Sequence, residues 1–257
     1  MVVCVKEILD PEMPAKSFKT DPEAKRAIPP KDMQLVISDY DESAVEAALK
    51  IKDSLESKIT VMSLGSESAK NIIKRCIAMG ADEGILLSDP LFNDSDSFAT
   101  AFVLAEAIKK LGNFDLILCG RQEGDWDAGQ VGSGIAELLD IPSVTMIGNI
   151  EVKERRVVVE RVISDGREIV EVPLPALVTV SSEIGEPRYP SFRRVREASK
   201  KEIPTWNAQD ITPVEPRNKM LRLSVPTREL KCEFVTGETA EEAGINLALK
   251  LREIKAI

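Results

Sequence analysis

The sequence predicts an α/β fold with a doubly wound parallel sheet, a β-hairpin extension and a C-terminal arm. Three observations support this prediction. Short apolar runs alternate with amphipathic helical stretches as far as Ile141, which is typical of consecutive parallel βαβ units. Strand-like segments then flank Asp165-Gly166, a favoured hairpin turn. The chain ends in a proline-containing stretch of weak periodicity and one further helix.

The elements of the parallel sheet are expected in chain order. The run Val2–Val5 lacks polar alternation, so it predicts a strand buried on both faces. A polar loop with several prolines follows, and the spacing of Ser43 and Glu46 predicts that a helix opens there. Gly80 stands where the next helix would end. The other predicted strands cover 59–63, 84–87, 116–119 and 177–180, and the other helices 98–111 and 131–139.

The pattern changes after Ile141. Segments 144–152, 156–163 and 168–172 have the character of strands, and the last two alternate as a half-exposed hairpin would. A long stretch after residue 186 has too little periodicity to supply its own core, so it is expected to be disordered or to lie along another surface. The closing helix, about 239–254, presents an apolar face that predicts docking on a partner subunit.

Composition excludes several classes of function. The net charge of -9 gives nucleic-acid binding no global support. The chain has no histidine, which removes Ser–His and Cys–His nucleophile pairs and histidine-ligated metals. Its four cysteines form no CxxC pair, so free buried thiols are expected rather than a metal site. Because no signal peptide or membrane-spanning run is found, a cytoplasmic protein without membrane insertion is predicted.

The glycine-rich segment from Gly120 to Gly134 is the first candidate site. It follows a short buried strand and opens a helix, which is where parallel α/β sheets bind ligands. Free amides and the dipole at the helix start favour a phosphate, whereas Asp125 and Asp127 suit ribose hydroxyls or capping. A tight turn that merely needs glycine explains the pattern equally well, since the segment is neither GxGxxG nor a Walker A motif.

A basic segment with two aromatic residues is the second candidate. Tyr189 and Phe192 lie among six Arg or Lys residues between 188 and 202, in a chain that is otherwise acidic. Apolar anchors inside a basic rim suit docking on an acidic protein surface. A solvated run of charge is the alternative, and composition alone leaves it open.

The order of several motifs resembles the electron-transfer flavoprotein beta subunits. The opening VVCVKEILDP is similar to the family's V-x-V-K start, and AMGAD at 78–82 matches a family segment. The run LILCGRQEGDWDAGQVG resembles the family's L-L-G-K/R-Q-x-x-D-x-D-x-x-Q-x-G motif, and VEVPLPALVTVSSEIGEPRYPSF its L-P-A-V-V-T…E-P-R-Y segment. These matches run in order from residue 1 to about residue 200.

The resemblance implies a Rossmann-like domain over 1–186 that binds an adenine nucleotide, then a recognition loop and partner-wrapping arm over 187–257. The implied nucleotide-binding residues are Cys4, Ser38, Asp39, Tyr40, Asp41, Val61, Leu64, Gly120, Arg121, Gln122, Glu123, Gly124, Asp125, Trp126, Asp127, Ala128, Gly129, Gln130, Val131 and Gly132. The implied partner-docking residues are Arg188, Tyr189, Phe192, Arg193 and Arg194.

The resemblance also implies the function. The expected protein is an electron carrier rather than an enzyme, a heterodimer with an alpha subunit that contributes most of the FAD site. It would pass electrons between a flavin dehydrogenase, such as an acyl-CoA dehydrogenase, and a downstream acceptor. An ATP- or AMP-binding module of the universal-stress or hydrolase kind is the alternative.

One departure bears on the cofactor of the beta site. Members that hold AMP read D-C-N-Q-T-G, whereas this chain has Asp127-Ala-Gly-Gln-Val-Gly132. This form favours a second FAD over AMP, and FAD in this site would make NADH-linked electron bifurcation possible. Ser38-Asp39 also replaces the usual Asn-Pro, so that wall of the pocket differs from the family pattern.

Overall fold

The chain divides into two compact units, Met1–Leu223 and Ser224–Ile257. The structure is a computed structural model that describes residues 1–23, 25–30, 33–225 and 232–257. The predicted arm therefore includes residues, 226–231, that lie outside the described part of the chain.

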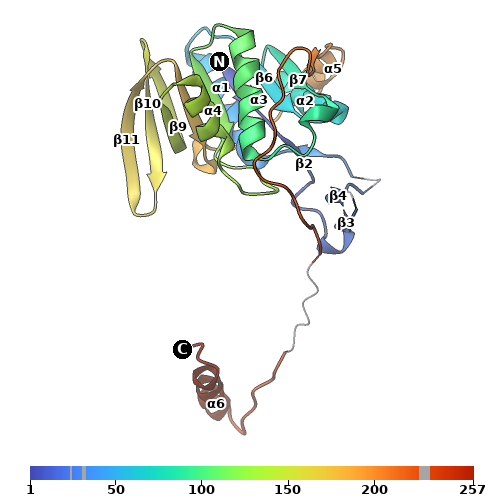
Figure 1. Cartoon of the computed structure of the whole chain (residues 1–257). Helices are drawn as coiled ribbons and strands as arrows, with labels where there is room; N and C mark the ends of the chain where they lie inside the picture. The colour runs from blue at the N-terminus through green and yellow to red at the C-terminus, as the bar shows by residue number, and fades with distance from the viewer. Residues whose placement is uncertain (24, 31–32, 226–231) are drawn as a thin grey trace. The chain divides into compact units, whose positions relative to one another are not determined.

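A nine-stranded sheet organises the first unit, and Figure 1 shows it with helices on both faces. The strand order is β11-β10-β9-β12-β8-β1-β6-β7-β13. The strands are β1 (Val2–Cys4), β6 (Thr60–Leu64), β7 (Glu83–Leu87), β8 (Leu116–Gly120), β9 (Ser143–Lys153), β10 (Arg156–Ile163), β11 (Gly166–Pro173), β12 (Ala176–Val180) and β13 (Thr205–Trp206). Pairing is parallel from β9 through to β13 and antiparallel between β9, β10 and β11. The predicted doubly wound sheet and its hairpin extension are confirmed.

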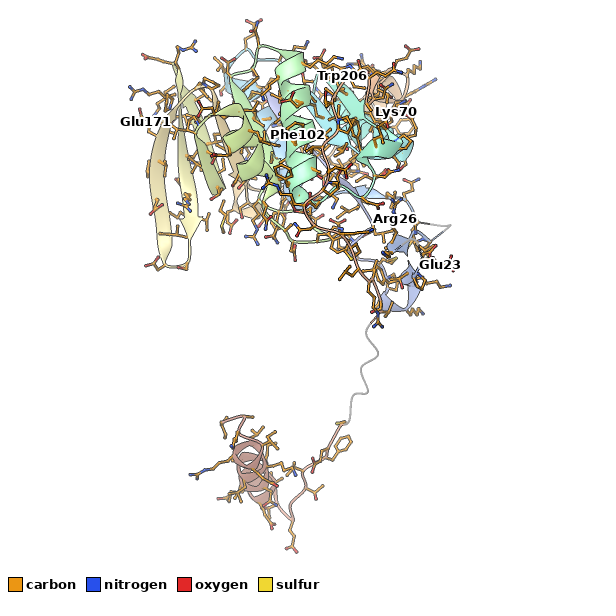
Figure 2. The ribbon with its side chains drawn as sticks, in the orientation of Figure 1. Glu23, Arg26, Lys70, Phe102, Glu171 and Trp206 are labelled. Atoms are coloured by element: carbon orange, nitrogen blue, oxygen red, sulfur yellow. The ribbon has the colours of Figure 1, made fainter. Side chains whose placement is uncertain are left out.

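Two hydrophobic cores lie on the two faces of this sheet. Helices α1 (Asp39–Ser54) and α2 (Lys70–Met79) pack on one face, and α3 (Ser97–Leu111) and α4 (Val131–Leu139) on the other. The four parallel strands nearest the centre of the sheet are buried almost throughout. Glu171 on β11 and Trp206 on β13 mark the opposite edges of the sheet (Figure 2).

The helix predicted to open at Ser43 begins earlier, at Asp39. The capping-box prediction is wrong, because the Ser43 hydroxyl is buried within the helix and donates to the carbonyl oxygen of Asp39. Three acidic residues, Asp39, Asp41 and Glu42, occupy the first turn instead. Their negative charge is favourable beside the unpaired amides of a helix start.

Short elements fill the loops that the sequence left unassigned. The N-terminal excursion contains two small two-stranded pairings, β2 (Glu7–Ile8) with β5 (Val36–Ile37) and β3 (Lys19–Asp21) with β4 (Arg26–Ile28). Four 3₁₀ turns are also present: η1 (Ala15–Ser17), η2 (Glu67–Ala69), η3 (Pro90–Phe92) and η4 (Ser182–Ile184). The hairpin loop is Ser164-Asp165, one residue before the predicted turn, since Gly166 already belongs to β11.

The stretch after residue 186 is partly ordered on the first unit. Helix α5 (Phe192–Ser199) packs against α2, and β13 then extends the sheet beside β7. Further along, the carboxylate of Asp96, which caps α3, accepts hydrogen bonds from the backbone amides of Arg217 and Asn218. This part of the stretch therefore lies along another surface, as predicted, and that surface belongs to the chain's own first unit.

The second unit contains the predicted closing helix, α6 (Ala240–Glu253). The Thr239 hydroxyl caps it by accepting from the amide of Glu242. Large apolar side chains of this unit stay exposed, among them Phe234, Ile245 and Leu249. No helix in the described part of the chain is long and apolar enough to cross a membrane.

Candidate functional site

The sheet changes its winding direction between β1 and β8. The chain leaves β1 through α1 on one face and leaves β8 through α4 on the other. Adjacent strands whose connections diverge in this way open a crevice at their carboxyl ends, the usual ligand position in doubly wound folds. Here the crevice lies between Cys4, at the end of β1, and Gly120, at the end of β8.

The carboxylate of Asp41 bridges this crevice. Its Oδ2 accepts from the backbone amide of Lys6 at 2.8 Å, and its Oδ1 accepts from the amide of Gly120 at 3.0 Å. The side chain of Asp41 is buried, and burial raises the pKa of its carboxyl group to about 7 even though both amide bonds and the charge of Lys6 act in the opposite direction. The predicted nucleotide-binding residue Asp41 therefore contacts backbone rather than open space.

The glycine-rich loop is tied to the start of α1 by further contacts. The Gly124 amide donates to Ser38 Oγ at 3.1 Å, and Lys6 Nζ pairs with Asp125 Oδ1 at 2.7 Å. The guanidinium of Arg121 lies 4.5 Å from the centroid of the Tyr40 ring. The structure thus brings the two predicted segments, 38–41 and 120–132, into one site. It adds Lys6, which the sequence offered only as a polar residue directly after the first strand.

The loop also has internal order. Asp127 and Gly129 have positive φ angles of 52° and 62°, and Gln122 Nε2 donates to Asp127 Oδ1 at 2.8 Å. The Gly129 amide donates to Glu123 Oε2, and Trp126 remains 52% exposed. Backbone amides at the start of α4 lie just beyond this turn, where a negative group is favoured.

The glycines of this segment have different tasks. Gly129 supplies the left-handed turn. Gly132 instead serves packing, because a Cβ atom there would lie 2.7 Å from Thr179 Cγ2 on β12. Gly129 therefore serves the turn and Gly132 the packing of α4, and the ligand interpretation of the motif stays a prediction.

Three other predicted nucleotide-binding residues lie deeper. Val61 is completely buried in the core beside α1 and α2, and Cys4 belongs to the core beside α3 and α4. Leu64, at the end of β6, is half-buried. Their contacts with a nucleotide stay a prediction.

The five predicted docking residues fall into two groups. Tyr189 and Phe192 are each 85% exposed, and among the described residues the Arg193 guanidinium pairs only with Glu197, on the same helix. Arg188 and Arg194 instead bind their own domain. Arg194 donates to the Met79 carbonyl oxygen at 3.2 Å.

Arg188 is held by two carboxylates of α1. Its Nε lies 2.9 Å from Oε2 of the buried Glu46, and its Nη2 lies 2.7 Å from Oδ2 of Asp53. The backbone amide of Arg188 also donates to Glu46. Arg188 therefore fixes the base of the segment that displays the two aromatic side chains.

The cysteines and acidic residues do not suggest a metal. Cys4, Cys76 and Cys119 are free and buried as expected, whereas Cys232 is free but exposed, so the expectation of buried thiols fails for that residue. Within the described residues, no three cysteine or carboxylate side chains gather where they could hold a metal ion.

Comparison with known proteins gives the family. The electron transfer flavoprotein domain matches residues 31–211, a range that includes Asp41, the glycine-rich loop and the segment 188–194. The chain belongs to the electron-transfer flavoprotein family. The beta-type subunits of this family are electron carriers, so the universal-stress or hydrolase alternative is not supported.

Relatives align with nearly the whole chain. The caffeyl-CoA reductase-Etf complex subunit CarD of Acetobacterium woodii is 36% identical, over 98% of this chain and 98% of its own. The electron transfer flavoprotein subunit beta of Clostridium acetobutylicum is also 36% identical, with the same coverage of both chains. The corresponding beta subunit of Bacillus subtilis is 32% identical over 86% of this chain and 88% of its own.

The loop of this electron-transfer flavoprotein chain carries groups that suit an anionic ligand. Arg121 Nε is buried without a hydrogen-bond partner among the described residues. A buried donor of this kind is costly unless a ligand or water satisfies it. Together with the amides at the start of α4, it provides positive groups on the loop for a phosphate.

Proposed function

We propose that this chain is the beta subunit of a heterodimeric electron-transfer flavoprotein whose alpha subunit supplies most of the site for the electron-shuttling FAD. The observation that carries the proposal is the glycine-rich loop at the β1/β8 crevice, within the matched family domain. The flavin performs the electron transfer when it is bound. The residues of this chain bind and orient the adenine nucleotide and shield it from water.

The beta site is proposed to hold FAD rather than AMP. Ala128 and Gly129 carry no polar side chain between Asp127 and Gln130, and Val131 places an apolar one at the start of α4. Compared with the D-C-N-Q-T-G form, the loop therefore lacks side-chain hydrogen bonds that would hold a small nucleotide by its ribose or phosphate. NADH-linked bifurcation then belongs to the proposed activity.

Docking of a flavin dehydrogenase is proposed at the exposed aromatic residues of segment 188–194. Tyr189 and Phe192 supply apolar anchors, and Arg193 adds positive charge beside them. Large apolar side chains surrounded by a charged rim are the usual centres of binding energy in protein interfaces. An acyl-CoA dehydrogenase or a similar flavoenzyme is the expected partner.

The second unit is proposed to pack on the alpha subunit. Its helix α6 carries Ile245, Leu247 and Leu249, which are all exposed. A helix with this much exposed apolar surface is stabilised when a partner covers it.

The test is to co-express the chain with its alpha-type subunit, purify the complex and count the nucleotides released by denaturation. Two FAD and no AMP per heterodimer are expected. One FAD and one AMP would keep the electron carrier but refute the proposed cofactor of the beta site. A complex without flavin would refute the proposed function. The NADH-linked activity is tested separately, by adding NADH to the two-FAD complex and following the oxidation of NADH and the reduction of both flavins by absorbance.

A further inference from the structure

We infer that Asp41 is a positioning residue of the nucleotide site, whose carboxylate takes the place of a ligand anion at the β1/β8 crevice and fixes where the loop Gly120–Gln130 begins. The inference rests on the proposed function only in naming this loop as the nucleotide site. Its physical basis is the set of contacts around one buried carboxylate.

The first step is the use of the strand-end amides. In doubly wound folds the amides after neighbouring strands at the crevice are free to bind a ligand. Here the amides of Lys6 and Gly120 both donate to Asp41. A bound nucleotide therefore has to use the later part of the loop and the start of α4 for its anionic groups.

The second step is the closeness of this contact. A Cβ atom on residue 120 would lie 2.5 Å from Asp41 Oδ1, so the loop can approach the carboxylate only because position 120 is glycine. Four residues later, the amide of Gly124 donates to the hydroxyl of Ser38, the residue directly before α1. Two points of the loop are thus attached to the first turn of α1, and Asp41 holds the one next to the sheet.

The third step concerns the charge on Asp41. Lys6, after β1, favours the carboxylate, and Glu123, in the loop, opposes it. Two thiols, of Cys76 on α2 and Cys119 on β8, also lie near the Asp41 carboxylate. Burial raises the pKa of the Cys76 thiol. A contact with Cys4, together with burial, raises the pKa of the Cys119 thiol, so both thiols remain neutral. Burial, the largest cause, outweighs the two amide hydrogen bonds and the charge of Lys6 and raises the pKa of Asp41 to about 7. Protonation replaces one acceptor oxygen by a hydroxyl and weakens the hold on the loop.

The chain is well suited to a test by pH because it has no histidine. Besides Asp41, burial lowers the pKa of the Met1 amino group and raises that of Glu7. Both groups remain in an Asp41→Asn variant. A difference between the two proteins across neutral pH therefore reports Asp41.

The loop is measured first, without any nucleotide. Trp126 and Trp206 are the two tryptophans of the chain, so Trp206→Phe leaves Trp126 as the sole fluorescent reporter, inside the loop. Acrylamide quenching of the full-length chain is recorded from pH 6 to pH 8. Quenching is expected to rise as the pH falls through about 7. The Asp41→Asn variant should show high quenching at every pH. Asp115 is an exposed carboxylate at the opposite end of β8, so the Asp115→Asn variant should match the parent.

The nucleotide is measured second, as the dissociation constants of FAD and AMP from the co-expressed complex. Asp41→Asn is expected to weaken binding about tenfold at pH 8, the effect of losing hydrogen bonds to a charged acceptor, and less at pH 6. If Asp41→Asn does not fold, the pH profile of the parent still decides. A parent profile that is flat across neutral pH, or equal quenching of parent and variant, would overturn the inference. If the quenching of Trp126 depends on pH but the complex binds no nucleotide, the role of Asp41 in holding the loop is supported and only the proposed function is refuted.

Discussion

Replacing Arg188 should lower the free energy of unfolding of the domain itself, whether or not a partner protein is present. The Arg188→Met variant keeps most of the aliphatic stem and removes the guanidinium that faces Glu46 and Asp53. The hydrogen bonds that Arg188 donates to Glu46, and then those to Asp53, raise the pKa of Arg188, so its charge is permanent in the native protein. The variant leaves the carboxylate of Glu46 buried without its partner.

The magnitude follows from the burial of the two partners. Removing one partner of a buried ion pair costs about 3–5 kcal/mol, because the other charge stays desolvated. The Glu46 side chain is only 5% exposed, but that of Arg188 is 32% exposed, so water can partly replace the guanidinium. We therefore expect the lower end, about 3 kcal/mol, for the loss in free energy of unfolding. Asp53 is largely exposed and should matter much less.

The assay is urea denaturation of the full-length chain at pH 7, with the slope of the transition checked for constancy. Arg193→Met is the matched control, because Arg193 pairs with an exposed glutamate on the same helix. In the Arg188→Met/Glu46→Leu double variant much of the lost stability should return, since the unpaired charge is gone. If Arg188→Met unfolds at the same urea concentration as the parent and only dehydrogenase docking is lost, the reasoning is refuted and Arg188 is a docking residue.

Three further predictions concern packing, pH and thiol access. Gly132→Ala should destabilise the domain by about 1–3 kcal/mol in the same urea assay, because its Cβ would overlap Thr179; a neutral result would contradict the close packing of α4. Asp41 binds its proton more tightly in the folded than in the unfolded chain, so its contribution to stability is lost as the pH rises from about 4 to about 7. That interval corresponds to ~4 kcal/mol, and Asp41→Asn should remove this part of the pH dependence of urea unfolding. Finally, one thiol, that of Cys232, should react rapidly with a thiol reagent and three only after unfolding; two or more fast thiols would disagree with the burial pattern.

The sequence predicts the sheet well because its strands are buried runs bounded by turns. The segment 156–163 coincides with β10, and 177–180 lies within β12. Periodicity is informative wherever a whole face packs on the core, as it does for α2.

Other elements give no such signal. Helix α5 buries only Ala198, so its arginines dominate the pattern and no apolar stripe marks it. The strands β2 and β5 have two residues each, which is too short for alternation. The start of α1 depends on contacts between Asp41, Lys6 and Gly120, which are far apart in the chain. The family resemblance places Asp41 in the predicted site but cannot show that its carboxylate faces the backbone.

The position of β13 has a consequence for the order in which the domain can form during synthesis. Thr205 pairs with Leu86, so the edge of the sheet beside β7 stays open until the ribosome has added more than a hundred further residues. Its amides are meanwhile available to any passing strand, and Leu86 later donates to the carbonyl oxygen of Pro204. The nascent chain therefore carries an unpaired apolar edge for a long part of its elongation, and we expect a chaperone to act at this edge.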